Sequence, residues 1–122
     1  MAGKVYTVEE ANEVLPHLAP ALVELREKYE RAALIRERMA KLAAGNGWSD
    51  EREEWSQTLQ RVSTLIERVN EWEVELKDIA MGLVDFPTIV EGRDAYLCWR
   101  LGEPQVAYWH FREDGFAGRK PL

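Results

Sequence analysis

The fold of this chain is decided by one stretch of sequence, Tyr96-Leu-Cys-Trp-Arg-Leu-Gly-Glu-Pro-Gln-Val-Ala-Tyr-Trp-His110. It contains the only cysteine and one of the two histidines, and the segment 83–122 around it holds seven of the twelve aromatic residues. Short runs rich in aromatic and β-branched residues favour strands, whereas the residues before 83 have the periodicity of helices. The sequence therefore predicts one domain over residues 1–122, helical from about 7 to 82, with a β-meander and tail from about 83 to 122.

Three strands are predicted in the C-terminal part, and tight turns join them. The strands are Pro87–Val90, Ala95–Arg100 and Gln105–His110, and the turns are Glu91-Gly-Arg-Asp94 and Leu101-Gly-Glu-Pro104. Turns this short connect neighbouring antiparallel strands, so we expect a meander. Neither face of the middle strand is clearly polar, and we therefore expect the sheet to be covered on both faces.

The N-terminal part begins with a helix-start signal. The residues Thr7-Val-Glu-Glu10 have the form of a capping box. Pro16 and Pro20 each lack an amide hydrogen and clash with the preceding helical turn. We therefore expect a short first helix with a break or kink between about Leu15 and Pro20, and then a long helix to about Ala44.

A second long helix is predicted after Gly45-Asn-Gly47, because these residues tolerate positive φ. Ser49 or Asp50 would cap its start, and Gly82 would follow its last turn. Since the connection is short, the two long helices should form an antiparallel hairpin, on the order of 45 Å long at ~1.5 Å per residue.

The hairpin carries apolar stripes that are too broad for two helices to bury alone, so a second copy of the chain could cover them. The residues expected at such an interface are Trp55, Val62, Val69 and Trp72. Arg36 and Glu73 interrupt the stripes. A polar residue there either sets the register of an assembly or lies at the edge of the stripe and extends into solvent.

Composition limits the class of protein. The net charge is −6, from 16 basic and 22 acidic residues, and no basic face is segregated, which argues against nucleic acid and anionic membranes as partners. No uncharged stretch approaches the roughly 18 residues of a membrane span, and no signal peptide precedes the helix-start signal. A single cysteine excludes an intrachain disulfide and suits a reducing compartment. We therefore expect a cytoplasmic protein.

A polar cluster is expected among the aromatic residues of the sheet. Its members are Asp85, Arg100, His110 and Arg119, with Cys98 and Glu113 near them in the sequence. Arg100 and His110 lie on neighbouring predicted strands, and an arginine beside aromatic walls suits a carboxylate or phosphate ligand. The alternative is a structural ion pair of Asp85 with Arg100 or Arg119 that holds the tail on the sheet.

Two further kinds of site have weaker signals. Glu13 and His17 are four residues apart on one helical face and could bind a metal ion, although Pro16 lies between them. Cys98 could be a nucleophile with His110 as its base, but its apolar neighbours favour a buried hydrophobic role. The sequence identifies no cofactor.

Several motifs taken together resemble one known family. They are Thr7-Val-Glu-Glu-Ala-Asn-Glu-Val-Leu-Pro16, Gly82-Leu-Val-Asp-Phe-Pro87, Tyr96-Leu-Cys-Trp-Arg-Leu-Gly-Glu103, Tyr108-Trp-His110 and Gly115-Phe-Ala-Gly-Arg119. Over its whole length the chain is similar to the domain of unknown function 2203 family of small prokaryotic proteins. The resemblance implies a bacterial or archaeal cytoplasmic protein, and it implies no activity, substrate or cofactor because the family has none established.

The sequence as a whole predicts an α+β fold. A short N-terminal helix and a long antiparallel helical hairpin are followed by a three-stranded antiparallel β-meander packed on the hairpin. The favoured function is a non-catalytic binding or assembly protein that forms a homodimer through the hairpin. The alternative is a small ligand-binding or enzymatic protein, with or without a metal ion, whose polar pocket lies at the junction of sheet and hairpin. An open pocket lined by the four polar residues would favour the alternative, and a closed cluster would favour the first hypothesis.

Overall fold

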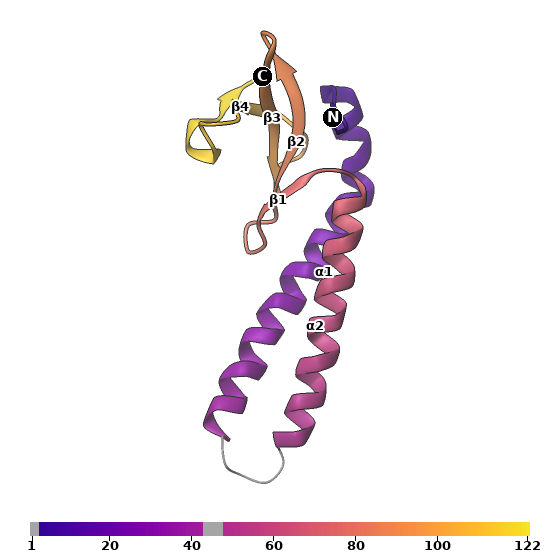
Figure 1. The fold of residues 1–122 in the computed structure, drawn as a ribbon, viewed down its shortest axis with the longest axis vertical. Helices are drawn as coiled ribbons and strands as arrows, with labels where there is room; N and C mark the ends of the chain where they lie inside the picture. The colour runs from indigo at the N-terminus through magenta and orange to yellow at the C-terminus, as the bar shows by residue number, and fades with distance from the viewer. Residues whose placement is uncertain (1–2, 43–47) are drawn as a thin grey trace.

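The computed structural model describes residues 3–42 and 48–122, and it has the predicted α+β fold (Figure 1). Two helices come first, α1 (Val8–Lys41) and α2 (Trp48–Glu71). The strands are β1 (Glu75–Asp78), β2 (Leu83–Val90), β3 (Arg93–Arg100), β4 (Tyr108–Phe111) and β5 (Lys120–Pro121), with a short 3-10 helix, η1 (Phe116–Gly118), before β5. The predicted break at Gly45-Asn-Gly47 lies outside the described residues.

Helix α1 starts at the predicted capping box and runs without interruption past both prolines. The Thr7 hydroxyl accepts a hydrogen bond from the Glu10 amide at 3.1 Å, and the Glu10 carboxylate accepts one from the Thr7 amide at 2.9 Å. The predicted break between Leu15 and Pro20, and with it the separate short helix, is wrong. Pro16 and Pro20 lie on the exposed face of α1, where water can bind the carbonyls that lose an amide partner, while Leu15 lies on the buried face.

Helix α2 differs from the prediction at both ends. It already includes Ser49 and Asp50, which are therefore not its caps, and it ends at Glu71 rather than at Gly82. Glu73 has a left-handed φ of 56°, a conformation that stops a helix, so it lies in a turn and not on a helical stripe. The predicted end of the helix at Gly82 is wrong because the apolar residues after Glu71 recur at intervals that fit a helix as well as paired strands.

The two helices pack against each other through buried apolar residues. One buried cluster comprises Leu25, Val62 and Leu65. Val69 joins a larger core that α1 and α2 share with the sheet. Beside the buried residues, the Arg61 guanidinium donates two hydrogen bonds to the Glu24 carboxylate at 2.6 and 2.7 Å. The hairpin is therefore held both by a hydrophobic seam and by a bidentate ion pair.

The strands form one antiparallel meander in the order β1-β2-β3-β4-β5, so the sheet has five strands and not three. The additional strands are at its edges: β1 uses residues predicted as helix, and β5 lies in the tail. Strand β4 starts at Tyr108 rather than Gln105, because the amide of Val106 donates to the Asn12 side chain of α1 at 2.8 Å instead of to a strand.

The alternation of side chains gives the sheet two different faces. One face packs on α1 through Val84, Phe86, Leu97 and Trp99. The residues that alternate with them, including Asp85, Cys98 and His110, lie on the opposite face. The tail, with η1, lies on the side of the sheet away from the helices (Figure 1).

The residues before α1 lie beside β2 and bond to it. The Tyr6 amide donates to the carbonyl of Pro87 at 2.7 Å, and the Thr88 hydroxyl donates to the carbonyl of Tyr6 at 2.8 Å. The Tyr6 ring is buried with its edge against Phe86, at 5.1 Å between centroids. The hairpin and the sheet thus share one hydrophobic core that begins ahead of α1.

Candidate functional site

The buried polar residues of the sheet gather on the face turned away from α1. Asp85 of β2, Cys98 of β3 and His110 of β4 are 2%, 0% and 2% exposed. Asp85 is the cross-strand partner of Cys98, and His110 lies opposite Tyr96, two residues along β4 from the partner of Cys98. One donor atom from each of the three lies within 4.8 Å of the other two. Within residues 3–42 and 48–122, no second group of three or more histidine, cysteine and carboxylate side chains converges in this way.

The backbone holds His110 in one orientation. Its Nδ1 lies 2.8 Å from the carbonyl oxygen of Phe111, which can only accept, so Nδ1 carries a proton and donates it. Its Nε2 lies 3.2 and 3.1 Å from the two carboxyl oxygens of Asp85. The ring packs on Tyr96, whose hydroxyl donates to Glu75 at 2.5 Å. Burial, and then this carboxylate, raise the pKa of Tyr96 to about 12, so the hydroxyl remains a donor.

The contact between His110 and Asp85 requires one shared proton. Because Nδ1–H is bound to Phe111, a neutral ring presents its lone pair at Nε2, which would repel an ionised carboxylate. The proton therefore lies on Nε2 or on Asp85. Burial is the largest influence on the pKa of Asp85 and raises it above the ordinary value, although the positive charge and hydrogen bond of His110 act to lower it. A protonated Asp85 that donates to Nε2 is thus favoured by the low polarity of the site.

Cys98 completes the cluster as a thiol. Burial, and then the nearby carboxyl of Asp85, raise the pKa of Cys98 to about 12, so the S–H is protonated at neutral pH. A nucleophilic cysteine needs a lowered pKa and access to solvent. The structure instead places Cys98 in the interior of β3, in the buried position that its apolar neighbours favour.

Arg119 lies against the cluster beside Cys98. Its Nη1 lies 3.9 Å from Cys98 Sγ, and its guanidinium packs on the rings of Tyr108 and Phe116, 4.0 and 4.5 Å from their centroids. Its ionic partner is Glu103, which accepts hydrogen bonds at 2.6 and 3.3 Å. Sequence reasoning missed Glu103, because its place in the turn before β4 is the only signal and many turns carry a glutamate.

Arg100, an expected member of the cluster, and Glu113, expected near it, lie apart from it in the structure. Arg100 is exposed at the end of β3, with its guanidinium 6.0 Å from the ring of Phe116. Glu113 pairs with Arg93 at the surface. Both residues are charged groups in contact with solvent.

The structure also changes the expected pairing and the expected place of the site. Asp85 is bonded to His110 and Arg119 to Glu103, in place of the predicted pairs of Asp85 with Arg100 or Arg119. The predicted position at the junction of sheet and hairpin is wrong, because the neighbours of Asp85 along β2 point to α1 and Asp85 points to the other face.

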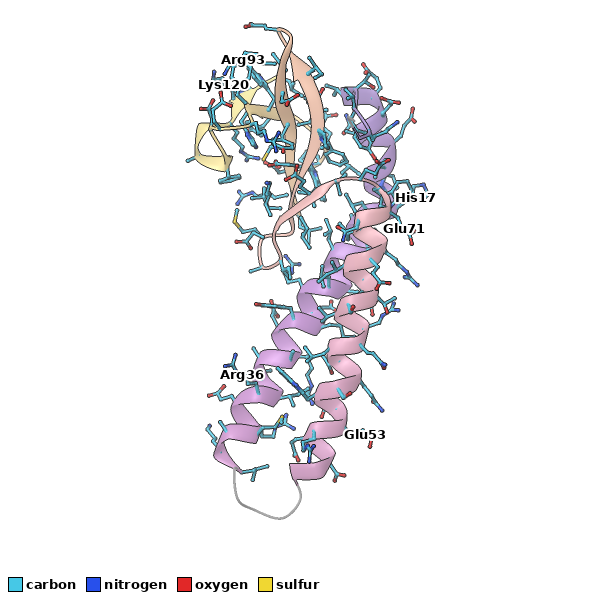
Figure 2. The ribbon with its side chains drawn as sticks, viewed as in Figure 1. His17, Arg36, Glu53, Glu71, Arg93 and Lys120 are labelled. Carbon is cyan, nitrogen blue, oxygen red and sulfur yellow. The ribbon has the colours of Figure 1, made fainter. Side chains whose placement is uncertain are left out.

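Glu13 and His17, the residues with a weak metal signal, lie on α1 near the end of α2. They line a groove of about 420 Å³ that also includes Glu71 and Trp72. His17 stacks on Trp72 with 5.9 Å between ring centroids and 25° between planes. Figure 2 shows His17 and Glu71 close together where the hairpin meets the sheet. The described residues add no third donor that would complete a metal site with Glu13 and His17.

The residues expected at a dimer interface have different positions in the protomer. Val62 and Val69 are buried within the chain, so they hold the protomer together. Trp55 is partly exposed, and Trp72 is exposed and stacked on His17. Of these four residues, only Trp55 and Trp72 therefore have side-chain surface that another molecule could contact.

The chemistry open to the cluster follows from its burial. Asp85, Cys98 and His110 have almost no exposed surface, so they cannot present an acid or base to a substrate in solution. They offer one oxygen, one sulfur and one nitrogen donor to anything small enough to fit among them. This is a donor set of the kind that binds zinc and related ions.

Comparison with known proteins places the chain in a family. The model of the family DUF2203, described as an uncharacterized conserved protein, matches residues 4–122, and the chain belongs to this family. The resemblance carried by the sequence motifs is thereby confirmed. No curated protein and no solved structure matches the chain. Because the family description names no activity or ligand, function must be argued from the residues themselves.

Proposed function

We propose that this member of the DUF2203 family is a non-catalytic binding or assembly protein that acts as a homodimer through its helical hairpin. The main observation behind the proposal is a stripe of apolar side chains on α2 that the sheet covers only in part. Ile66 packs with Leu76 and Ile79 on the buried cluster between the helices. Leu59, seven residues earlier on the same face of α2, is 41% exposed. The hairpin extends well beyond the sheet (Figure 1).

Helix α1 adds a second exposed apolar side chain to this region. Tyr29 is exposed and lines a shallow depression together with Leu76 and Ile79. Single exposed apolar residues are common on protein surfaces. An apolar stripe that continues past the end of its cover, on two adjacent helices, is instead typical of an interaction surface.

The closed polar cluster supports a non-catalytic role. Asp85 and His110 share one proton, and Cys98 is a buried thiol with a high pKa. Arg119 is bound to Glu103. The residues that could act as acid, base or nucleophile are thus engaged with one another rather than arranged around an open pocket.

The charges at the tip of the hairpin support a second copy of the chain as the partner. Arg31 and Glu54 pair with each other within the protomer. Beyond that pair, residues 36–41 of α1 include three basic and one acidic side chain, whereas residues 50–53 of α2 include three acidic and one basic. Arg36 and Glu53 mark these two helices in the distal half of the hairpin (Figure 2). A two-fold pairing that brings α1 of one protomer against α2 of its partner matches opposite charges twice.

We further propose that the protein is prokaryotic and cytoplasmic, and that neither nucleic acid nor a membrane is its partner. The support is the net charge of −6, the single free cysteine Cys98 and the family resemblance. Neither described helix combines the length and the apolar character that crossing a membrane would require.

The test is the mass of the untagged protein in solution, measured by light scattering over a range of concentrations for three chains. Leu59→Glu places a charge on the proposed interface. Ile89→Glu is the matched control, because Ile89 is 48% exposed on β2, outside the hairpin. We expect the wild type and Ile89→Glu to be dimers and Leu59→Glu to be a monomer with an unchanged unfolding transition, since Leu59 is exposed in the protomer.

A monomeric wild type, or a Leu59→Glu chain that stays dimeric, would refute the proposal. Val69→Glu is not a useful test of assembly, because Val69 is fully buried in the protomer and a charge there should unfold the chain.

A further inference from the structure

We propose that Asp85, Cys98 and His110 form a binding site for one divalent transition-metal ion, of which zinc is the representative. The three donors come from three neighbouring strands, β2, β3 and β4, on one face of the sheet. An ion bound there would tie these strands together at the centre of the sheet. The site is independent of the proposed hairpin interface, because it lies on the sheet face turned away from α1.

The separations of the three donor atoms fit three of the four ligand positions around a tetrahedral ion. With zinc–nitrogen and zinc–oxygen bonds of about 2.0 Å, tetrahedral geometry places the nitrogen and the oxygen about 3.3 Å apart. Nε2 of His110 lies 3.2 and 3.1 Å from the carboxyl oxygens of Asp85. A sulfur about 2.3 Å from zinc would lie roughly 3.6 Å from the other donors. Since all three donors already lie within 4.8 Å of one another, small side-chain shifts would bring Cys98 Sγ to that separation.

Two of the three donors have the outer contacts that metal ligands use. A metal-bound imidazole usually donates its other N–H to a carbonyl or carboxylate, and His110 donates Nδ1–H to Phe111 at 2.8 Å, which leaves Nε2 for the ion. The sulfur of Cys98 faces Nη1 of Arg119 at 3.9 Å. Glu103 fixes that guanidinium, so a positive group is held beside the position of a thiolate.

A divalent ion also balances the charge of this buried site. Binding requires an ionised Asp85, an ionised Cys98 and a neutral His110. Their two negative charges cancel the charge of the ion, so no net charge is buried. Two protons leave for each ion bound, one from the thiol and one from the pair that Asp85 and His110 share. Sulfur and imidazole donors select the zinc class over magnesium and calcium, which prefer oxygen ligands.

The experiment is a titration of the untagged, chelator-treated full chain with cobalt(II), followed by displacement with zinc(II). Cobalt bound to a thiolate absorbs in the near ultraviolet, and tetrahedral cobalt has intense visible bands. Because Cys98 is the only cysteine, the thiolate band in the wild type reports this site without any mutant. Cys98→Ser and His110→Gln change ligands. Arg100→Ala, at the exposed end of β3, and His17→Ala, which removes the other histidine, are the matched controls.

We expect one cobalt per chain with both absorptions, displacement by zinc, no effect of magnesium and a rise in the unfolding temperature with zinc. The bands should disappear in Cys98→Ser and persist in both controls. In His110→Gln the apparent affinity for cobalt should fall by at least tenfold. Absence of uptake by a folded wild-type chain would overturn the proposal. Uptake without a thiolate band, or uptake abolished by His17→Ala, would overturn it as well, because the ion would then lie elsewhere.

Discussion

Gly82 offers a sharp test of the turn that joins β1 to β2. Its φ is +60°, its carbonyl accepts a hydrogen bond from the Leu101 amide at 3.2 Å, and it follows the turn in which Asp78 binds the Met81 amide. A Cβ atom added at Gly82 would lie 3.0 Å from Leu101 Cβ and closer still to its Cγ and Cδ1. Gly82→Ala therefore combines an unfavourable backbone conformation with a steric clash.

Gly92 provides the matched control for the size of the effect. Its φ is +73°, and nothing lies within 4 Å of an added Cβ, so Gly92→Ala has the backbone cost alone. That cost is about 1–2 kcal/mol for a residue with a side chain. Inserting a methyl group into occupied space adds about 1–3 kcal/mol. We therefore expect Gly82→Ala to lose roughly 2–5 kcal/mol of unfolding free energy, and Gly92→Ala roughly 1–2 kcal/mol.

The assay is equilibrium unfolding in urea, followed by circular dichroism, for both alanine variants and for Gly82→Ala combined with Leu101→Ala. Removing Leu101 Cγ and Cδ1 should relieve most of the clash, so the double variant should be more stable than the sum of the two single changes predicts. Equal losses for Gly82→Ala and Gly92→Ala would refute the reasoning. Equal losses are what a helix end at Gly82 would give, because a C-terminal glycine of a helix has positive φ without Leu101 beside it.

Three further predictions concern the hairpin. Thr7→Ala should cost about 1 kcal/mol in urea unfolding, because it removes the hydroxyl that caps the Glu10 amide, and Thr7→Ser should restore most of that loss. The hydrogen bond from Arg61 lowers the pKa of Glu24 below the ordinary value of a glutamate. This contribution to stability is therefore present above the ordinary pKa and is lost as the pH falls through the lowered pKa. The stability difference between wild type and Glu24→Gln should therefore shrink in unfolding curves taken from pH 7 to pH 3, and a constant difference would contradict the ion-pair account. Leu65→Ala should lower the free energy of unfolding by about 2–5 kcal/mol, measured by calorimetry or in urea, because Leu65 is fully buried between the helices. A loss under about 1 kcal/mol would contradict close packing of Leu65 between the helices.

Local signals in the sequence were sufficient for several elements. The capping box at Thr7 depends on residues within one helical turn, and the turn at Glu91 and Gly92 depends on two residues that take φ of 53° and 73°. The β-rich composition of residues 83–122 likewise located most of the sheet. These features depend on interactions between near neighbours, which a sequence displays directly.

Other features depend on contacts between distant residues, and these the sequence could not decide. The prolines at 16 and 20 are tolerated because the buried face of the same helix packs on the sheet. The end of α2 could not be placed, since its apolar spacing suits a helix as well as strands until the pairing of β1 with β2 is known. The amide of Val106 leaves the strand only because Asn12 lies across from it.

The sequence by itself determined the α+β class, the start of α1 and the presence of Asp85, Cys98, His110 and Arg119 in one region. Only the tertiary structure decided that the first three meet, that Arg119 binds Glu103 instead, and that their face is turned away from the hairpin. The physical reason is that side chains alternate along a strand, so shifting a strand by one residue exchanges the two faces. Which face α1 covers is set by the packing of its apolar stripe, which lies far from the site in the sequence.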